Sequence, residues 1–228
     1  SPQDIVATFM NAPIRLLLPV GVALIAGAGL AAQLGDRFVA STRARVDIRR
    51  YLARRAGVSV AATFGIFFVV GIITAVSAYY IAPAVMGVQY DPEGYGLHSP
   101  AAIMTESIHI APLTALLQFG PVAYIFGVGA WLGLNAAVLA LVTVAAVLLI
   151  RRQVVALVVP FLVYMLQSVI AQHAGAGGAS LIISAAYPSG MQNYALSTAA
   201  VPAAVLGVVA LAIVVWRIVG ARTDLRFS

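Results

Sequence analysis

Five long apolar stretches dominate the pattern of hydrophobic and polar positions along the chain. They are separated by short polar or arginine-rich segments and lie at about 14–34, 57–82, 124–150, 154–172 and 198–218. A helix needs about 20 predominantly apolar residues to cross about 30 Å of hydrocarbon, and each stretch approaches or exceeds that length. Strands of a membrane barrel would instead alternate apolar and polar residues. The pattern therefore predicts an all-α fold, a polytopic bundle of transmembrane helices forming one domain over residues 1–228.

Shorter segments are expected beside these spans. Leu113–Phe119 is apolar but is followed by Gly120 and Pro121, which predicts a shallow helix that stops before the third span. Leu181–Tyr187 is too short to cross and lies among glycines, which predicts half of a re-entrant hairpin covered by protein. Residues 83–112 are polar and turn-rich, with a short interfacial helix expected over 101–110.

Composition supports a membrane protein. The chain has 228 residues, of which 62% are hydrophobic and only 9% charged, whereas about 25% of the residues of a soluble domain are charged. The net charge of +6 does not indicate nucleic-acid binding, because the arginines lie at the ends of the apolar stretches, where membrane topology accounts for them. The chain has no cysteine, so neither a disulfide framework nor a thiolate metal site is expected.

The segment 35–55 is the most highly charged part of the chain. It holds seven arginines and two aspartates, and an arginine at the bilayer centre costs about 2.5–3.5 kcal/mol, so this segment must lie in water. Asp47 lies four residues after Arg43 and three before Arg50, a spacing that pairs charges on a helix. We expect a short helix that docks onto a partner through Arg43, Arg45, Asp47, Ile48, Arg49, Arg50 and Tyr51. The alternative is a solvated loop that only sets topology.

The distribution of arginine predicts the orientation. All but one of the 13 basic residues lie at 37–55, 151–152 and 217–226, and a model with five spans places these three groups on one face. The positive-inside rule makes that face cytoplasmic. The amino-terminal end then lies outside the cell. Without a signal sequence, this end reaches the outside most simply through a preceding helix, so we expect a further helix before Ser1.

The energy source is expected to lie outside the spans. The second to fifth apolar stretches carry no acidic or basic residue before Arg217, which argues against a secondary transporter driven by ions or protons. Every basic residue is arginine, so the phosphate-binding loop of an ATPase, which requires lysine, cannot be formed by this chain. Any nucleotide must bind to another subunit.

A few polar residues within or near the spans are candidates for chemistry. His173 lies close in sequence to Ser180 and Ser184, which leaves an intramembrane serine hydrolase as an alternative. Three residues of the segment 83–112, which the orientation places outside the cell and which we call the outer segment, have metal-ligating side chains, namely His98, Glu106 and His109. Such residues in a polar loop are more often solvated, so no metal site is predicted.

Two amides and two glycines inside the apolar stretches complete the set of candidates. Asn135 and Gln167 could line a substrate path, although hydrogen bonding between helices is the simpler reading. Gly129 and Gly133 form a GxxxG pair, which favours close packing against another helix.

The order of spans and loops resembles the type-2 ATP-binding-cassette (ABC) exporter permeases. In that family the cytoplasmic loop carries an acidic residue, Gly-Thr, and an arginine before a tyrosine-leucine stretch that ends in a basic residue. Asp36, Ala40-Ser41 and the segment 49–55 (RRYLARR) look like that pattern, with Asp for Glu, Ala-Ser for Gly-Thr, and no proline.

The resemblance implies a permease subunit with no cofactor and no catalytic residue of its own. It would pair with a second, identical or similar, permease chain and with two cytoplasmic ABC subunits that bind ATP and magnesium, in the inner (plasma) membrane of a prokaryotic cell. The family has six spans, with the first lying before Ser1. A charge-free interior favours export of a hydrophobic or amphipathic cargo. The alternative from another class is a non-transporting membrane scaffold subunit.

Overall fold

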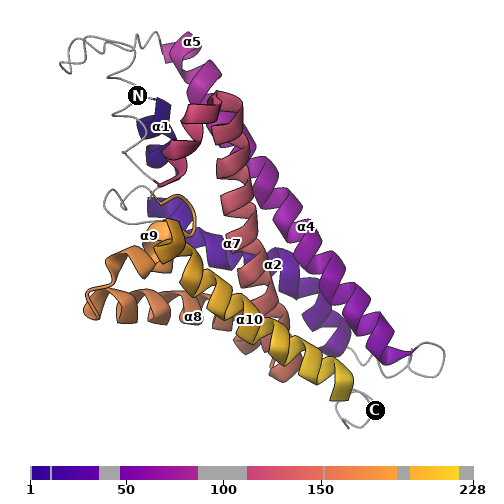
Figure 1. Cartoon of the computed structure of the whole chain (residues 1–228). Coiled ribbons are helices and arrows are strands. Elements are labelled where there is room, and N and C mark those ends of the chain that lie inside the picture. Colours follow the sequence, from indigo (N-terminus) through magenta and orange to yellow (C-terminus); the bar gives the residue numbers. More distant parts are fainter. Residues whose placement is uncertain are drawn as a thin grey trace.

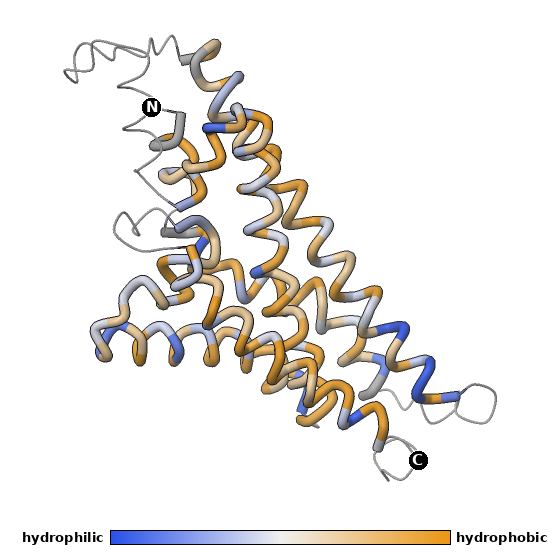
Figure 2. Tube along the Cα trace, viewed as in Figure 1, coloured by the Kyte–Doolittle hydropathy of each residue, from blue (hydrophilic) through white to orange (hydrophobic). Residues whose placement is uncertain are grey.

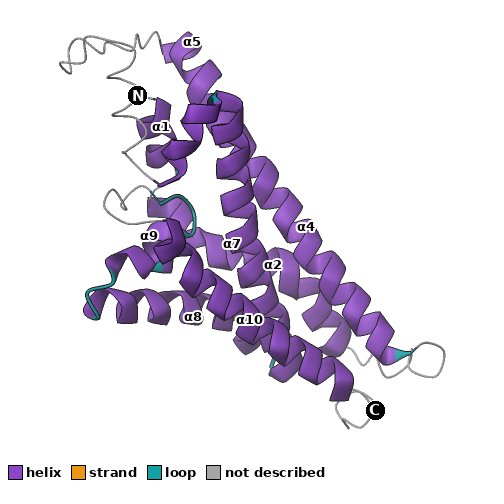
Figure 3. Ribbon diagram, viewed as in Figure 1, coloured by secondary structure: helices purple, strands orange, loops and turns teal. Residues whose placement is uncertain are grey.

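The computed structural model describes residues 2–10, 12–35, 47–86, 112–150, 152–188 and 196–220. Within these ranges every regular element is a helix, as Figure 3 shows, which confirms the all-α prediction. Five helices are long and apolar enough to cross a membrane: Ile14–Gln33, Ile48–Ile81, Pro121–Leu149, Gln153–His173 and Leu196–Gly220. The prediction of five apolar helices of membrane-spanning length is therefore confirmed for the described part of the chain.

The elements follow one another as a series of long helices joined by short ones. The long helices are α2 (Ala12–Gly35), α4 (Ile48–Val76), α7 (Pro121–Leu149), α8 (Gln153–His173) and α10 (Leu196–Gly220). The short ones are α1 (Pro2–Phe9), the π-helical turn Ser77–Ile81, α5 (Ala82–Met86), the 3₁₀ helix Pro112–Phe119, the 3₁₀ turn Gly177–Ala179 and α9 (Leu181–Ser184).

Helix α7 forms the centre of the bundle (Figure 1). In the most apolar part of α7, 72% of the residues are buried. The corresponding share is 17% in the span Ile48–Ile81, which includes α4, and 22% in α10. Helix α7 contacts α2, α4, α8 and α10. The other helices expose many large apolar side chains, and Figure 2 shows the hydrophobic residues running along their lengths with a hydrophilic group at the amino-terminal end of α4. This distribution suits helices that face lipid.

Glycines bring α4 and α7 into backbone contact. A Cβ atom built at Gly71 would lie 2.7 Å from Cα of Gly129, and one built at Gly129 would lie 2.9 Å from the carbonyl oxygen of Phe68. A Cβ atom at Gly133 would lie 3.1 Å from the Phe64 carbonyl oxygen. The close packing expected from the GxxxG pair is confirmed, and its partner is α4.

Two predicted boundaries are corrected by the structure. Helix α4 begins at Ile48 and not near 57, so the arginine-rich residues 48–55 are the first turns of a spanning helix and not a separate short helix. The third span begins at Pro121 and not at 124, because Gly120 adopts a φ of 98° and Pro121 fits the first helical position. The break expected before this span is confirmed, and Pro112–Phe119 forms a 3₁₀ helix.

The segment after α8 folds back over the bundle. Leu181, Ala185, Ala186 and Tyr187 are buried, and α9 has only four residues. This agrees with a covered, non-spanning piece, although only this half of the expected hairpin lies within the described residues. The expected interfacial helix at 101–110 and most of the outer segment lie outside them.

Candidate functional site

The amino-terminal end of α4 is held in place by a cap. The Asp47 side chain accepts a hydrogen bond from the backbone N–H of Arg49 at 3.1 Å, and the Asp47 carbonyl accepts one from the N–H of Tyr51 at 3.0 Å. Aspartate is a favoured N-cap residue because its oxygen satisfies an otherwise unpaired N–H of the first turn. Asp47 therefore fixes where the helix starts, in addition to any role toward a partner.

One face of this end belongs to the protein core. Ile48 and Leu52 are 5% and 1% exposed and pack in a cluster to which all five long helices contribute. The Tyr51 hydroxyl donates to Oε1 of Gln33 in α2 at 2.8 Å. Of the residues predicted to contact a partner, Ile48 and Tyr51 thus contact the chain itself. They attach the arginine-bearing turns firmly to the bundle.

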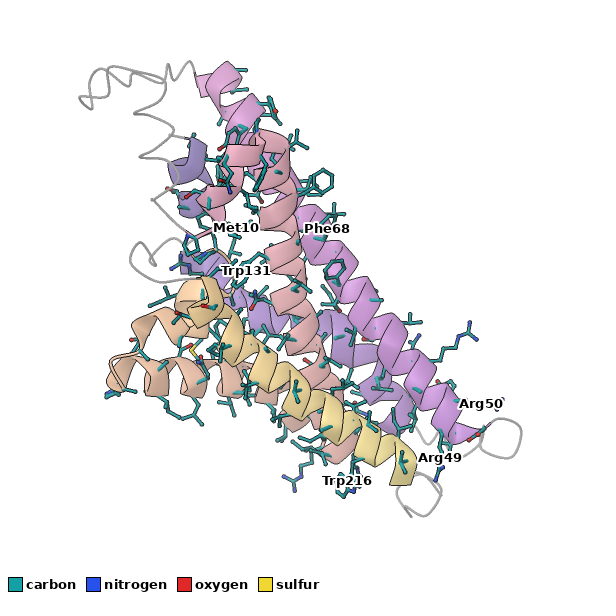
Figure 4. The ribbon with its side chains drawn as sticks, in the orientation of Figure 1. Met10, Arg49, Arg50, Phe68, Trp131 and Trp216 are labelled. Atoms are coloured by element: carbon teal, nitrogen blue, oxygen red, sulfur yellow. The ribbon has the colours of Figure 1, made fainter. Side chains whose placement is uncertain are left out.

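The other faces carry the arginines. Arg50 and Arg54 are exposed one turn apart, while Arg49 is half-buried. Figure 4 shows Arg49 on the side of α4 near the end of α10 and Arg50 on a different side. Arg43 and Arg45 lie outside the described residues. Arg55 is exposed as well, with its guanidinium close to Gly29 of α2, so Arg50 and Arg54 form the exposed pair, one turn apart, that can receive a partner.

The other basic groups gather at the same end of the bundle. Arg217 of α10 donates from Nε and Nη2 to the carbonyl oxygen of Leu148, at 3.3 and 3.2 Å. This cation closes the carboxyl end of α7, where the helix dipole favours positive charge. Arg152 is exposed just before α8. The structure thus brings the arginines of α4, the arginine just before α8 and the arginine in the last turn of α10 to one end of the bundle, as the predicted orientation requires.

The two amides predicted to line a substrate path bind backbone groups. Asn135 is 4% exposed, and its Nδ2 donates to the carbonyl of Trp131 in the same helix at 2.9 Å. Gln167 donates to the carbonyl of Ala179 at 2.7 Å and accepts from the N–H of Leu181 at 3.0 Å. Gln167 therefore fastens the folded-back segment onto α8, and a role for either amide toward substrate stays a prediction.

The Gln167 contacts give a testable stability prediction. Gln167→Leu leaves the Ala179 carbonyl and the Leu181 N–H without their side-chain partner, and an unsatisfied, partly buried group costs about 1–3 kcal/mol. We expect the variant to unfold at a lower temperature in detergent. Gln172→Leu, at an exposed position on the same helix, is the control and should leave Tm unchanged. Equal Tm values for the two variants would show that Gln167 does not hold this segment.

The residues of the hydrolase alternative do not form a catalytic pair. The His173 ring is exposed, and its Nδ1 lies 2.9 Å from the carbonyl oxygen of Val169. Ser184 donates to the carbonyl of Ser180 at 2.9 Å, and Oγ of Ser180 is buried without a hydrogen-bond partner among the described residues. No histidine is placed to activate either hydroxyl in the described part of the chain, so the geometry gives no support to this alternative.

No metal centre is evident in the ranges that the structure covers. They contain no group of three or more histidine, cysteine, aspartate or glutamate side chains close enough to hold an ion. The three candidate residues His98, Glu106 and His109 lie outside these ranges.

A buried cluster of polar aromatic residues was not anticipated from the sequence. The hydroxyls of Tyr124 and Tyr187 lie 2.6 Å apart, Arg15 donates to the carbonyl of Tyr187 at 3.1 Å, and Tyr164 donates to the carbonyl of Arg15 at 3.0 Å. These bonds join α2, α7 and α8 to the folded-back segment. The available signal was the placement of tyrosines inside apolar stretches, because a buried hydroxyl needs a partner.

No protein family model, curated protein or solved structure matches this chain.

Proposed function

We propose that this chain is the membrane subunit of an ABC exporter and that a separate ATPase subunit binds at Arg50 and Arg54. The observation that carries the proposal is the continuity of α4, in which the exposed arginines and the membrane span belong to one helix, Ile48–Val76. At about 1.5 Å per residue, 29 residues extend about 43 Å, more than the thickness of the hydrocarbon. A displacement of the arginine end therefore moves the span itself.

The packing of α4 supports transmission of such a movement. Its first turns are attached to α2 through Tyr51 and Gln33, and further along it meets α7 backbone to backbone at Gly71 and Gly129. Closely packed helices transmit a shift with little compression, because protein interiors are as dense as organic crystals. Closure of an ATPase against Arg50 and Arg54 would thus reach the most buried helix of the bundle.

The same arrangement bears on the cargo and the partners. The described parts of the second to fifth spans hold no carboxylate or lysine that could couple an ion gradient, so we assign energy input to ATP and magnesium on the partner. The apolar lining of these four spans suits a hydrophobic or amphipathic substrate. A second permease chain, identical or similar, would complete the transporter in the plasma membrane.

The test is isolation of the tagged chain from its native membranes. We expect an ABC ATPase to copurify, and its rate of ATP hydrolysis to rise when the complex is placed in liposomes. The double variant Arg50→Glu and Arg54→Glu should lose the ATPase, because like charges replace complementary ones across the interface. Arg152→Glu, at an exposed arginine just before α8, is the control and should retain it.

The outcomes separate the two parts of the proposal. If no ATPase copurifies with the unaltered chain, the assignment as a transporter subunit is wrong and a scaffold role takes its place. If the ATPase copurifies equally with the double variant, the transporter assignment stands and the docking surface is elsewhere.

A further inference from the structure

An apolar groove runs between α4, α7 and α10. Its volume is about 590 Å³, within the range of about 300–1,000 Å³ that is usual for sites of small ligands. Small residues of α4, including Ala53 and Gly57, form one wall, while Leu141 of α7 and Val214 of α10 lie opposite. Every lining residue is apolar. The groove thus suits a hydrocarbon chain.

The groove has the length of one membrane leaflet. Along α4 its lining runs from Ala53 to Phe64, which is about 17 Å at 1.5 Å per residue. Half of the hydrocarbon thickness is about 15 Å. A single acyl chain that lies in the groove would therefore end near the middle of the bilayer, with its headgroup at the arginine-rich end.

Positive charge lies at that end of the groove. Arg49 precedes Ala53 by four residues, a spacing that puts both side chains on the same face of α4. Arg49 is half-buried, and its Nε atom is buried without a hydrogen-bond partner among the described residues. In Figure 4 its side chain extends toward the end of α10, whose residues line the groove. The guanidinium is therefore placed to receive an anionic headgroup.

We propose that this groove is a binding site for one anionic phospholipid, with an acyl chain along Gly57 and Val60 and the phosphate group at Arg49. The positive charge of Arg49 at this end of the groove favours a lipid over an apolar helix of a partner protein. Such a helix would leave the buried Nε of Arg49 without an acceptor. The helix terminus itself is not the anion site, since the Asp47 carboxylate already accepts from its first turn. A bound lipid would join α4 to α10.

The site does not depend on the proposed function. It would exist in a scaffold subunit as well as in a transporter, and it uses Arg49, whereas the proposed ATPase contact uses Arg50 and Arg54. In a transporter the lipid would sit beside the turns that receive the ATPase, so the lipid composition of the membrane would influence that contact.

The test measures binding of two phospholipids with the same fluorescent acyl chain to the purified full chain in detergent. Phosphatidylglycerol should bind about tenfold more tightly than phosphatidylcholine. Both carry a phosphate that can accept from the guanidinium, but the choline ammonium cancels the phosphate charge and is repelled by the arginines at this end of the groove. Arg49→Gln should remove most of this preference, because it weakens binding of phosphatidylglycerol much more than binding of phosphatidylcholine. Soluble glycerol phosphate should not compete, because it has no acyl chain.

Glycine variants test the groove itself. A Cβ atom at Gly57 meets nothing within 4 Å, so Gly57→Leu fills the groove without disturbing the fold, and it should weaken binding of both lipids at least fivefold. Gly65 of the same helix is equally open but does not line the groove, so Gly65→Leu is the matched control and should bind as the unaltered chain does. Equal affinity for the two lipids, competition by glycerol phosphate, or equal binding by the two glycine variants would overturn the proposal.

Discussion

Replacing Gly71 with valine is expected to prevent stable packing of the bundle. Even the first added carbon would lie 2.7 Å from Cα of Gly129 and 3.2 Å from the Val128 carbonyl oxygen, and neither is a flexible side chain that can turn away. Helices α4 and α7 would have to separate along their contact. Overpacking a core usually costs about 1–3 kcal/mol, and a clash between two backbones lies at the upper end of that range or beyond it.

The measurement is the yield of monodisperse protein in detergent and its Tm. Gly71→Ala should already lower both, and Gly71→Val should abolish the folded fraction. Gly65→Val is the matched control, because it changes the same helix at a position where a Cβ atom meets nothing within 4 Å. If Gly71→Val and Gly65→Val gave the same yield and Tm, the contact between the backbones of α4 and α7 would not be a principal support of the fold.

The number of spans was predictable because burial in lipid imposes a simple length rule. An apolar run of about 20 residues can satisfy its backbone in hydrocarbon only as a helix, whatever the rest of the chain does. The start of α4 was not predictable in this way, because hydropathy changes at Ala56 whereas the helix begins at the Asp47 cap. Local capping, which hydropathy does not register, decided the boundary.

The candidate site was only partly accessible from sequence. The charge density of 35–55 identified the right end of the bundle, but the faces of the helix depend on which neighbours it meets. Ile48 and Tyr51 face the core and α2, whereas Arg50 and Arg54 face outward. The groove could not be foreseen, because residues from three helices far apart in the sequence form it.

The orientation of the bundle is the central claim, because the arginine end can meet a cytoplasmic ATPase only from inside the cell. Two exposed glutamines, Gln153 and Gln172, lie at opposite ends of α8. They are 19 residues apart, or about 29 Å, close to the thickness of the hydrocarbon. The core cluster that contains Ile48 and Leu52 of α4 also contains Ala156, so Gln153 reports on the arginine end. Substituting either glutamine leaves every arginine in place.

Because the chain has no cysteine, Gln153→Cys and Gln172→Cys each carry a single thiol for labelling. We expect a membrane-impermeant maleimide to label Cys at 172 on intact cells and to label Cys at 153 only after the membrane is made permeable. Labelling of position 153 on intact cells, with position 172 protected, would place the arginines outside and contradict the account.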